Sequence, residues 1–265
     1  MVAGVPELAP ETAQAWVARW DLQQLDHLPD REDRFTALID VAEAGAGRPD
    51  PLVLDLGCGP GSLSVRLLDR MPAATVVAID ADPLLLALGR AAYAGRAGLR
   101  FADCDLRTPG WAATLGLDRP VDVAVSTTAL HWLPEPALRA MYAELAGLLR
   151  PAGLLLDGDH FTGGEHTGPV IAQLSEALTE RVEQARFPLG HTETWSGWWA
   201  AVAADHQLAG LAARRERLAL DAAHHGSPSG WLATHVDALR AAGFSEVGTV
   251  WQVGNNRILC GVAGG

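Results

Sequence analysis

Three glycines at alternate positions follow a short apolar run, and this pattern can hold a nucleotide-like ligand. In PLVLDLGCGPGSLSVRLL the run reaches Asp55, the turn contains Gly57, Gly59 and Gly61, and a helical pattern begins after it. Glycines allow a tight turn and a close approach of backbone to ligand. The helix after Gly61 offers unpaired N–H groups to an anionic group. The spacing departs from the GxGxxG of dinucleotide-binding turns, because Ser62 follows Gly61.

Carboxylates end the next two strand-like runs. VVAID ends at Asp80, where a carboxylate can accept hydrogen bonds from both ribose hydroxyls of an adenosyl group and repels a 2′-phosphate. RFADCDLR then places Asp103 and Asp105 at the end of the following run. One of these can accept a hydrogen bond from an adenine amino group, although both have an alternative as helix-capping or loop residues. Together with the glycine turn, these acids predict an adenosyl-binding site.

Two histidines follow the fourth and fifth strand-like runs. His131 lies in ALHWL and His160 lies just past LLLDGD, so both belong to the carboxyl edge where open α/β sheets bind ligands. A positioned imidazole can take a proton near neutral pH, and we consider both residues as catalytic candidates. For His131 the alternative is a structural role in bracing its loop. Asp157 and Asp159 can orient His160 or bind a cationic substrate, unless they are simply solvated.

The elements that must position these residues alternate regularly. Strand-like runs are expected at 52–56, 75–80, 99–104, 121–126 and 153–158, with helices at 61–70, 83–94, 109–116 and 134–149. This spacing implies a parallel sheet with right-handed crossovers. Two further runs, 245–253 and 257–263, are separated by a glycine and two asparagines, which predicts a terminal antiparallel hairpin.

Helical patterns flank this alternation. Residues 11–44 read as two amphipathic helices broken at Pro29, and helix-like stretches occur at 169–185, 194–213 and 231–242. We therefore predict an α/β protein with a Rossmann-like seven-stranded sheet, mostly parallel with an antiparallel C-terminal hairpin. Its expected parts are an N-terminal helical lid at 1–48, a core at 49–160 and 230–265, and a helical cap insertion at 161–229.

The motifs LDLGCGPG, AIDADP and VDVAVSTTALHWLP resemble those of class I S-adenosylmethionine-dependent methyltransferases. Within that family the chain is most similar to bacterial small-molecule enzymes of the trans-aconitate methyltransferase type, in which ALHWL and LLRPGG-like segments recur. The resemblance covers about residues 50 to 160 well and the rest loosely. Here the second segment reads LLRPAGLLLDGDH, with Ala152 where glycine is more usual.

This resemblance implies which residues hold S-adenosylmethionine. Asp105 is preferred to Asp103, because the family's adenine-binding acid stands four residues after the phenylalanine of this strand, here Phe101. The methionine part of the cofactor is expected to contact Asp55, Gly57, Gly59 and Gly61. The ribose is expected to bind Asp80, the adenosine to lie near Ala81, and the adenine to bind Asp105 and Leu106. The sulfonium and its methyl group are expected near Ser126 and Thr127.

The resemblance also implies methyl transfer to an oxygen, nitrogen or carbon atom of a small molecule, with S-adenosylhomocysteine as by-product. In such an in-line displacement the enzyme mainly aligns the acceptor and removes water, so closure of lid and cap is expected. A hydroxyl or amine acceptor would use a base, whereas a carboxylate would not. Two alternatives stay open: a nicotinamide-dependent oxidoreductase with a similar turn, and a protein that uses the pocket for binding or for a non-methylating reaction such as a cyclisation.

Composition narrows the partners. The net charge is -12, the isoelectric point is about 5.1 and all 20 basic residues are arginine, which disfavours nucleic acid. The densest basic cluster, Arg214, Arg215 and Arg217, is predicted to form a solvated helix face. The three cysteines lack CxxC spacing, so neither disulfides nor zinc are predicted. With neither an export signal nor a membrane-spanning run in the sequence, we expect a soluble, cytoplasmic monomer or homodimer that does not bind membranes.

Three further groups have competing interpretations. Arg34 can clamp a carboxylate of cofactor or substrate, or form a surface ion pair with Glu32 or Asp33. No metal is predicted, because His224 and His225, considered together with Asp221, lack a recognisable ligand spacing. A hydrophobic cap core is favoured over an aromatic substrate sandwich for Trp195, Trp198 and Trp199.

Overall fold

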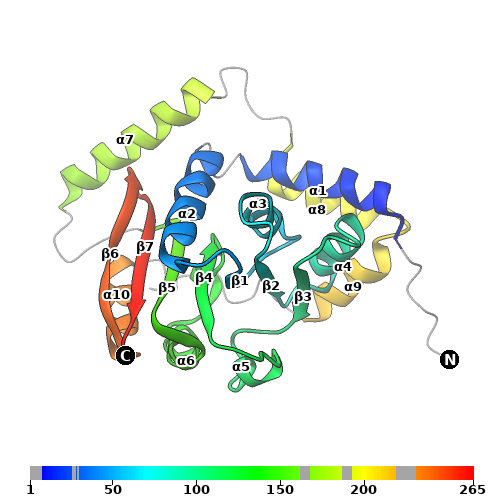
Figure 1. Ribbon diagram of the computed structural model, residues 1–265. Coiled ribbons are helices and arrows are strands. Elements are labelled where there is room, and N and C mark those ends of the chain that lie inside the picture. Colours follow the sequence, from blue (N-terminus) through cyan, green and yellow to red (C-terminus); the bar gives the residue numbers. More distant parts are fainter. Residues whose placement is uncertain (1–7, 26–27, 29, 162–167, 187–192, 219–230) are drawn as a thin grey trace.

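The predicted seven-stranded sheet is confirmed (Figure 1). The computed structural model describes residues 8–25, 28, 30–161, 168–186, 193–218 and 231–265. The strand order is β3-β2-β1-β4-β5-β7-β6, in which β7 runs antiparallel to both neighbours and the remaining pairs are parallel. The strands are β1 (Leu52–Leu56), β2 (Thr75–Asp80), β3 (Leu99–Asp103), β4 (Val121–Thr127), β5 (Leu149–His160), β6 (Phe244–Val253) and β7 (Asn256–Ala263).

Helices follow the predicted order with two corrections. The helix expected around 109–116 is limited to the four residues Trp111–Thr114. The stretch expected as a single helix over 194–213 is two helices, because the Asp205 side chain accepts a hydrogen bond from the backbone of Gln207 at 2.7 Å and ends the first. The helices are α1 (Pro10–Gln24), α2 (Arg31–Ala46), α3 (Ser62–Arg70), α4 (Pro83–Ala92), α5 (Trp111–Thr114), η1 (Leu130–Trp132), α6 (Glu135–Leu148), α7 (Pro169–Arg186), α8 (Trp195–Ala204), α9 (Ala209–Arg217) and α10 (Leu232–Ala241).

Helices cover both faces of the sheet because its central strands are apolar on both sides. Successive side chains of a strand point to opposite faces. In β1, Leu54 and Leu56 pack into a core that contains residues of α6 and α10, whereas Val53 packs into a second core with α2 and α3. The result is a three-layer arrangement that fixes the positions of all the strand ends (Figure 1).

The strand order bears on which ligand the sheet holds. The usual dinucleotide-binding order is 3-2-1-4-5-6, whereas here the antiparallel β7 lies between β5 and β6. The connections reverse direction between β1 and β4, and ligands of open α/β sheets bind at the carboxyl ends of strands at such a point. The glycine turn after β1 and the segment 127–133 after β4 therefore face each other across this crevice.

Ala152, where the family pattern has glycine, adopts a left-handed backbone with φ +57°. This conformation costs a non-glycine residue roughly 1–2 kcal/mol, while glycine loses about 0.4–1 kcal/mol more conformational entropy on folding. Ala152→Gly should therefore raise the free energy of unfolding by about 0.5–1 kcal/mol, measured by urea titration. The matched variant Ala113→Gly, in the helical turn α5 with no such strain, should lower the free energy of unfolding. Equal changes in the two variants would contradict a strained backbone at Ala152.

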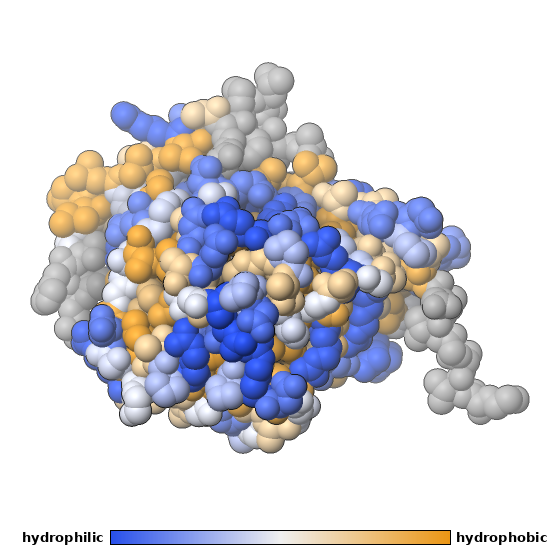
Figure 2. All heavy atoms as spheres, viewed as in Figure 1, coloured by the Kyte–Doolittle hydropathy of each residue, from blue (hydrophilic) through white to orange (hydrophobic). Residues whose placement is uncertain are grey.

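One helix presents an apolar strip to the surface. Val170, Ile171, Leu174 and Leu178 of α7 are exposed, and their spacing places them along one side of the helix. Figure 2 shows this strip in orange at the upper left. Among the described residues, no helix is both long and apolar enough to cross a membrane.

Candidate active site

A cavity of about 790 Å³ lies at the carboxyl ends of the central strands. Ligand pockets in proteins commonly have volumes of roughly 300–1,000 Å³. Asp55, Gly61 and Ser126 do not line this cavity and lie behind its walls. Its lining includes nine of the residues expected at the site: Gly57, Gly59, Asp80, Ala81, Asp105, Leu106, Thr127, His131 and His160.

The glycine turn is fixed by packing and by one carboxylate. Gly57 has φ +72°, and a Cβ atom there would lie 2.3 Å from the Cβ atom of Ala129, so no larger residue fits. The N–H of Gly59 donates to Oδ2 of Asp80 at 2.7 Å. At Gly61, with φ +91°, a Cβ atom would lie 2.9 Å from the ring of Phe101. These contacts fix the backbone of the turn, which forms part of the cavity wall.

Two of the predicted cofactor residues support this turn from behind. Asp55 is fully buried and accepts a hydrogen bond from Oγ of Ser64 at 2.5 Å, and burial raises the pKa of its carboxyl to about 7. The Oγ of Ser126 donates to the carbonyl of Leu56 at 2.9 Å. Both side chains therefore act in this structure through the position of the turn.

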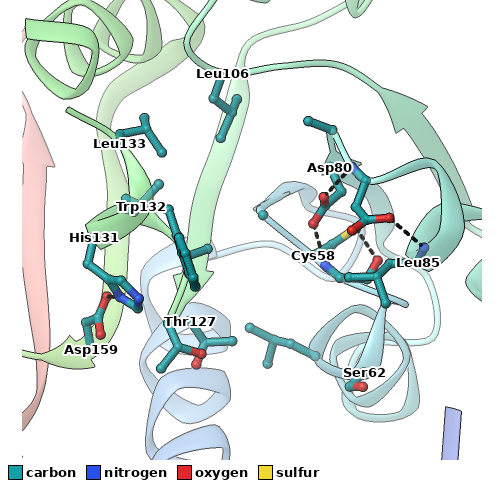
Figure 3. Close-up of a pocket in the computed structure, with 18 of the residues that line it drawn as sticks. Cys58, Ser62, Asp80, Leu85, Leu106, Thr127, His131, Trp132, Leu133 and Asp159 are labelled. Carbon is teal, nitrogen blue, oxygen red and sulfur yellow. Dashed lines mark hydrogen bonds and ion pairs between the residues drawn. The ribbon is translucent and has the colours of Figure 1, made fainter. Parts of the chain in front are cut away.

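Asp80 forms the centre of one cavity wall (Figure 3). Besides Gly59, the backbone N–H of Asp82 donates to its carboxylate, at 2.8 Å, and burial raises the pKa of Asp80 to about 6. Each carboxylate oxygen has two lone pairs, so Asp80 retains acceptor capacity for two ligand hydroxyls. It fits the ribose role expected of it.

The two acids after β3 differ in position. Asp105 lines the cavity and is bound by the guanidinium of Arg107 at 2.8 Å. Burial acts to raise the pKa of Asp105, but the hydrogen bonds from Arg107 outweigh it and the net shift is downward. Asp103 lies outside the cavity lining, half exposed, with its nearest oxygen 3.6 Å from Arg214. The geometry therefore fits the choice of Asp105 over Asp103.

Arg215 corrects the interpretation of the basic cluster as a solvated helix face. Its Nε atom lies 2.6 Å from Oδ2 of Asp82, and its guanidinium carbon lies 3.9 Å from the ring centre of Trp199. Only 14% of the Arg215 side chain is exposed, and it lines the cavity. Burial raises the pKa of Asp82 against the opposing charge of Arg215. Sequence reasoning missed this pair because its members are 133 residues apart.

The tryptophans divide between the two roles considered for them. Trp198 is fully buried and packs against Trp16 and Trp20, with ring centres 5.8 and 5.0 Å apart. Trp195 and Trp199 also touch Trp20, and these three rings line the cavity. Helices α1 and α8 therefore share one aromatic cluster, and its inner side faces the ligand space.

His131 and Asp159 form a pair on the wall opposite Asp80 (Figure 3). Nδ1 of His131 lies 2.7 Å from Oδ2 of Asp159, and the other oxygen of Asp159 accepts the backbone N–H of His160 at 2.7 Å. Asp159 thus orients the ring of His131, whereas we expected it to orient that of His160. Burial, together with the charge of Arg34, lowers the pKa of His160, so its imidazole is neutral at pH 7.

Asp157 does not reach the cavity and cannot bind a substrate cation there. Its carboxyl is fully buried, and Oδ2 lies 3.4 Å from Nδ1 of His235, which also contacts the hydroxyl of Tyr142 at 2.7 Å. Burial and the neighbouring charge of Asp159 raise the pKa of Asp157 well above its usual range. Burial thus favours the neutral form of this carboxyl.

Arg34 is fully buried, so its interpretation as a surface ion pair is wrong. It donates to Oδ1 of Asn256 at 3.0 Å and to Oγ1 of Thr127 at 2.5 Å, and the amide of Asn256 donates to Asp30. Burial lowers the pKa of Arg34 to about 10, so it remains charged at neutral pH. It does not line the cavity and acts on the site by holding Thr127.

The remaining metal candidate, formed by Asp221, His224 and His225, lies outside the described residues. Within the described ranges, no group of three histidine, cysteine or acidic side chains is placed to hold a metal ion.

The charges of the lining suit a cationic ligand. Four carboxylates and two arginines line the cavity among the described residues, namely Asp80, Asp82, Asp105, Asp159, Arg107 and Arg215. A sulfonium group bound here would be surrounded by an excess of negative charge, and the ribose hydroxyls and the adenine amino group would find carboxylate hydrogen-bond acceptors. The residues present therefore fit S-adenosylmethionine.

Comparison with known proteins identifies the central part of the chain. Residues 53–153 match the family described as methyltransferase domain. Over 129 residues the chain is 36% identical to a trans-aconitate 2-methyltransferase of Streptomyces coelicolor, covering 47% of this chain and 39% of that protein. Over 166 residues it is 31% identical to a trans-aconitate 2-methyltransferase of Azoarcus sp., covering 60% of each.

The fold has similar solved structures. One is human N-acetylserotonin methyltransferase in complex with S-adenosylmethionine, with a TM-score of 0.53 at 14% identity, covering 97% of this chain and 57% of that one. The chain spans 39 to 60% of the length of the two curated relatives described above. Motifs, strand order and the match of residues 53–153 to the methyltransferase domain agree, and this part of the chain is similar to the class I S-adenosylmethionine-dependent methyltransferases.

Proposed function

We propose that this protein transfers the methyl group of S-adenosylmethionine to an atom of a small molecule. The observation that carries the proposal is the single cavity wall formed by the glycine turn and Asp80, facing a second wall that contains His131 and Asp159. A cofactor held on the first wall would present its reactive end to groups on the second.

Each wall has its own task in this mechanism. Asp80 and Asp105 would hold the ribose and the adenine, while Thr127, fixed by Arg34, would lie near the reacting methyl group. When bound, S-adenosylmethionine supplies a sulfonium methyl group whose carbon bonds to the acceptor atom as the C–S electron pair returns to sulfur. His131 and His160 are the proposed proton acceptors, because both line the cavity.

The division of the chain into lid, core and cap is part of the same proposal. Side chains of α1, α4, α8 and α9 form one hydrophobic cluster, which joins the proposed lid 1–48 and cap 161–229 to the core, formed by 49–160 and 230–265. Trp195 and Trp199 would exclude water from the reacting groups, and water-free sites strengthen electrostatic interactions. A cavity of this size, closed over by the proposed lid and cap, would favour a small acceptor over a macromolecule.

The test combines binding and turnover. Calorimetry with S-adenosylhomocysteine should give saturable binding at one site per chain, and NAD should not compete. S-adenosylmethionine carrying a tritiated methyl group should then transfer label to at least one member of a panel of small hydroxyl, amine and carboxyl compounds that includes trans-aconitate. Binding without transfer to any acceptor would favour a binding role or a non-methylating reaction.

Two further properties belong to the proposal. We propose a cytoplasmic location, because all three cysteine thiols are free, as in a reducing compartment. We also propose a monomer or homodimer that binds neither nucleic acid nor membranes, which sedimentation of the purified protein and a gel-shift assay would check.

A further inference from the structure

We propose that the acceptor is an uncharged hydroxyl compound, whose proton passes to His131 while Asp159 holds that histidine in position. This inference rests on the proposed function and names the substrate class for the same site. It is carried by the geometry of the pair, by the pairing of the arginines that line the cavity and by the apolar chain neighbours of His131.

The environment of Asp159 determines which nitrogen of His131 can act as the base. Asp159 is 3% exposed, and although burial acts to raise its pKa, the paired His131 outweighs this and lowers it. An ionised carboxylate is only an acceptor, so Nδ1 of His131, 2.7 Å away, must donate to it. In the neutral imidazole the lone pair is then on Nε2, which is the tautomer a proton acceptor needs.

The proposed step is balanced in atoms and electrons. The acceptor oxygen forms a bond to the methyl carbon as the C–S bond breaks and its electron pair returns to sulfur, and the hydroxyl proton moves to Nε2 of His131. The imidazolium that results is stabilised by Asp159 and later releases its proton to water. A carboxylate acceptor has no proton to lose, so its methylation would not use the His131–Asp159 pair as a base.

The arginines of the cavity are already matched to carboxylates. Among the described lining residues, Arg107 binds Asp105 through Nε at 2.9 Å and Nη2 at 2.8 Å, and Arg215 lies 2.6 Å from Asp82. Binding a polycarboxylate would require one of these pairs to break and leave a carboxylate uncompensated, which is costly in a partly buried site. The lining therefore disfavours an acceptor with several negative charges.

The chain neighbours of His131 along the cavity wall are apolar. Its neighbours Leu130, Trp132 and Leu133 all line the cavity, and Figure 3 shows Trp132 next to the imidazole, with ring centres 5.5 Å apart. On the cap side, Trp195 and Trp199 add two aromatic rings. Such walls bind the carbon skeleton of a phenol or an arylalkyl alcohol, with the hydroxyl directed at the histidine.

Asp159 is a positioning residue, because it contacts His131 and the backbone of His160. Asp159→Asn should preserve the volume of the side chain but remove the charge that favours the Nδ1–H tautomer. We expect its effect to resemble that of His131→Ala. A merely structural role for Asp159 would lower activity to the same extent with every acceptor.

The experiment compares acceptors of decreasing acidity: a nitrophenol, phenol and benzyl alcohol, with trans-aconitate as the polycarboxylate. The variants are His131→Ala and Asp159→Asn, and the matched control is His206→Ala, whose side chain is 92% exposed. Both variants should lower kcat by about 10²–10⁴-fold for benzyl alcohol, the range typical of a general base, and by less than about tenfold for the nitrophenol, which ionises without help. The control should change neither value.

The outcomes separate this inference from the proposed function. An equal loss of kcat for all acceptors would overturn the base role, and a higher kcat/KM for trans-aconitate than for every hydroxyl compound would overturn the substrate class. Both results would leave methyl transfer intact. Cofactor binding without methylation of any acceptor would instead contradict the proposed function, and this inference would fail with it.

Discussion

Replacement of Asp80 by alanine should weaken the binding of S-adenosylhomocysteine by at least about tenfold. A hydrogen bond to a charged group contributes roughly 1.5–3 kcal/mol, and a tenfold change in affinity corresponds to about 1.4 kcal/mol. The variant would lose the acceptor for the ribose hydroxyls, and it would also release the N–H groups of Gly59 and Asp82 that hold the turn. Titration calorimetry measures the effect directly.

The neighbouring strand offers a matched control for this variant. Asp103 pairs in register with Asp80 but lies outside the cavity lining, half exposed. Asp103→Ala should therefore leave the affinity within about twofold of the parent protein, as expected of an exposed, weakly paired carboxylate. If Asp80→Ala had no larger effect than Asp103→Ala, the ribose would have to lie elsewhere.

Replacement of Arg34 by methionine should lower the free energy of unfolding by about 3–5 kcal/mol, because removal of one partner from a buried polar network leaves the others unsatisfied. The side chain is fully buried and holds Asn256 and Thr127. Methionine fills a similar volume without donors, so the loss would arise from the missing hydrogen bonds and charge. Urea denaturation followed by far-UV circular dichroism measures it.

A surface arginine, Arg70, provides the control for the Arg34 variant. Arg70 forms ion pairs with Asp40 and Glu43, and all three side chains are about half exposed. Exposed ion pairs contribute between about 0 and 1 kcal/mol, so Arg70→Met should have little effect. A small effect of Arg34→Met, similar to that of Arg70→Met, would mean that water replaces the buried guanidinium.

The sheet was predictable from the sequence because strands and turns are determined largely by residues close together in the chain. The central strands β1, β2 and β4 are short apolar runs, and the GNN turn between β6 and β7 signals the hairpin within a few residues. Strand β5 begins at Leu149, earlier than the expected 153. The break at Asp205 was missed because the helical periodicity continues past a side chain that accepts a backbone hydrogen bond.

The site was predictable only where strand ends determine it. Asp80 is the last residue of β2, and His131 lies in η1 shortly after the end of β4, so their positions at the cavity follow from the topology. The burial of Arg34 depends on Asn256, which is 222 residues away, and the pairing of Arg215 depends on how α9 packs against the core. Neither contact leaves a periodic signal, because each side chain alone looks like an ordinary surface arginine.

The aromatic cluster shared by α1 and α8 makes the protein its own optical probe. Indole emission shifts to shorter wavelength and changes in intensity when the ring loses contact with water, and Trp20, Trp195 and Trp199 border the space that a ligand would fill. Arg215, a cation 3.9 Å from the ring centre of Trp199, would move with any rearrangement of α9. Stopped-flow fluorescence could therefore measure the rates of ligand association and release without an added dye. It would also separate the rate at which the site closes over the ligand from the rate of methyl transfer.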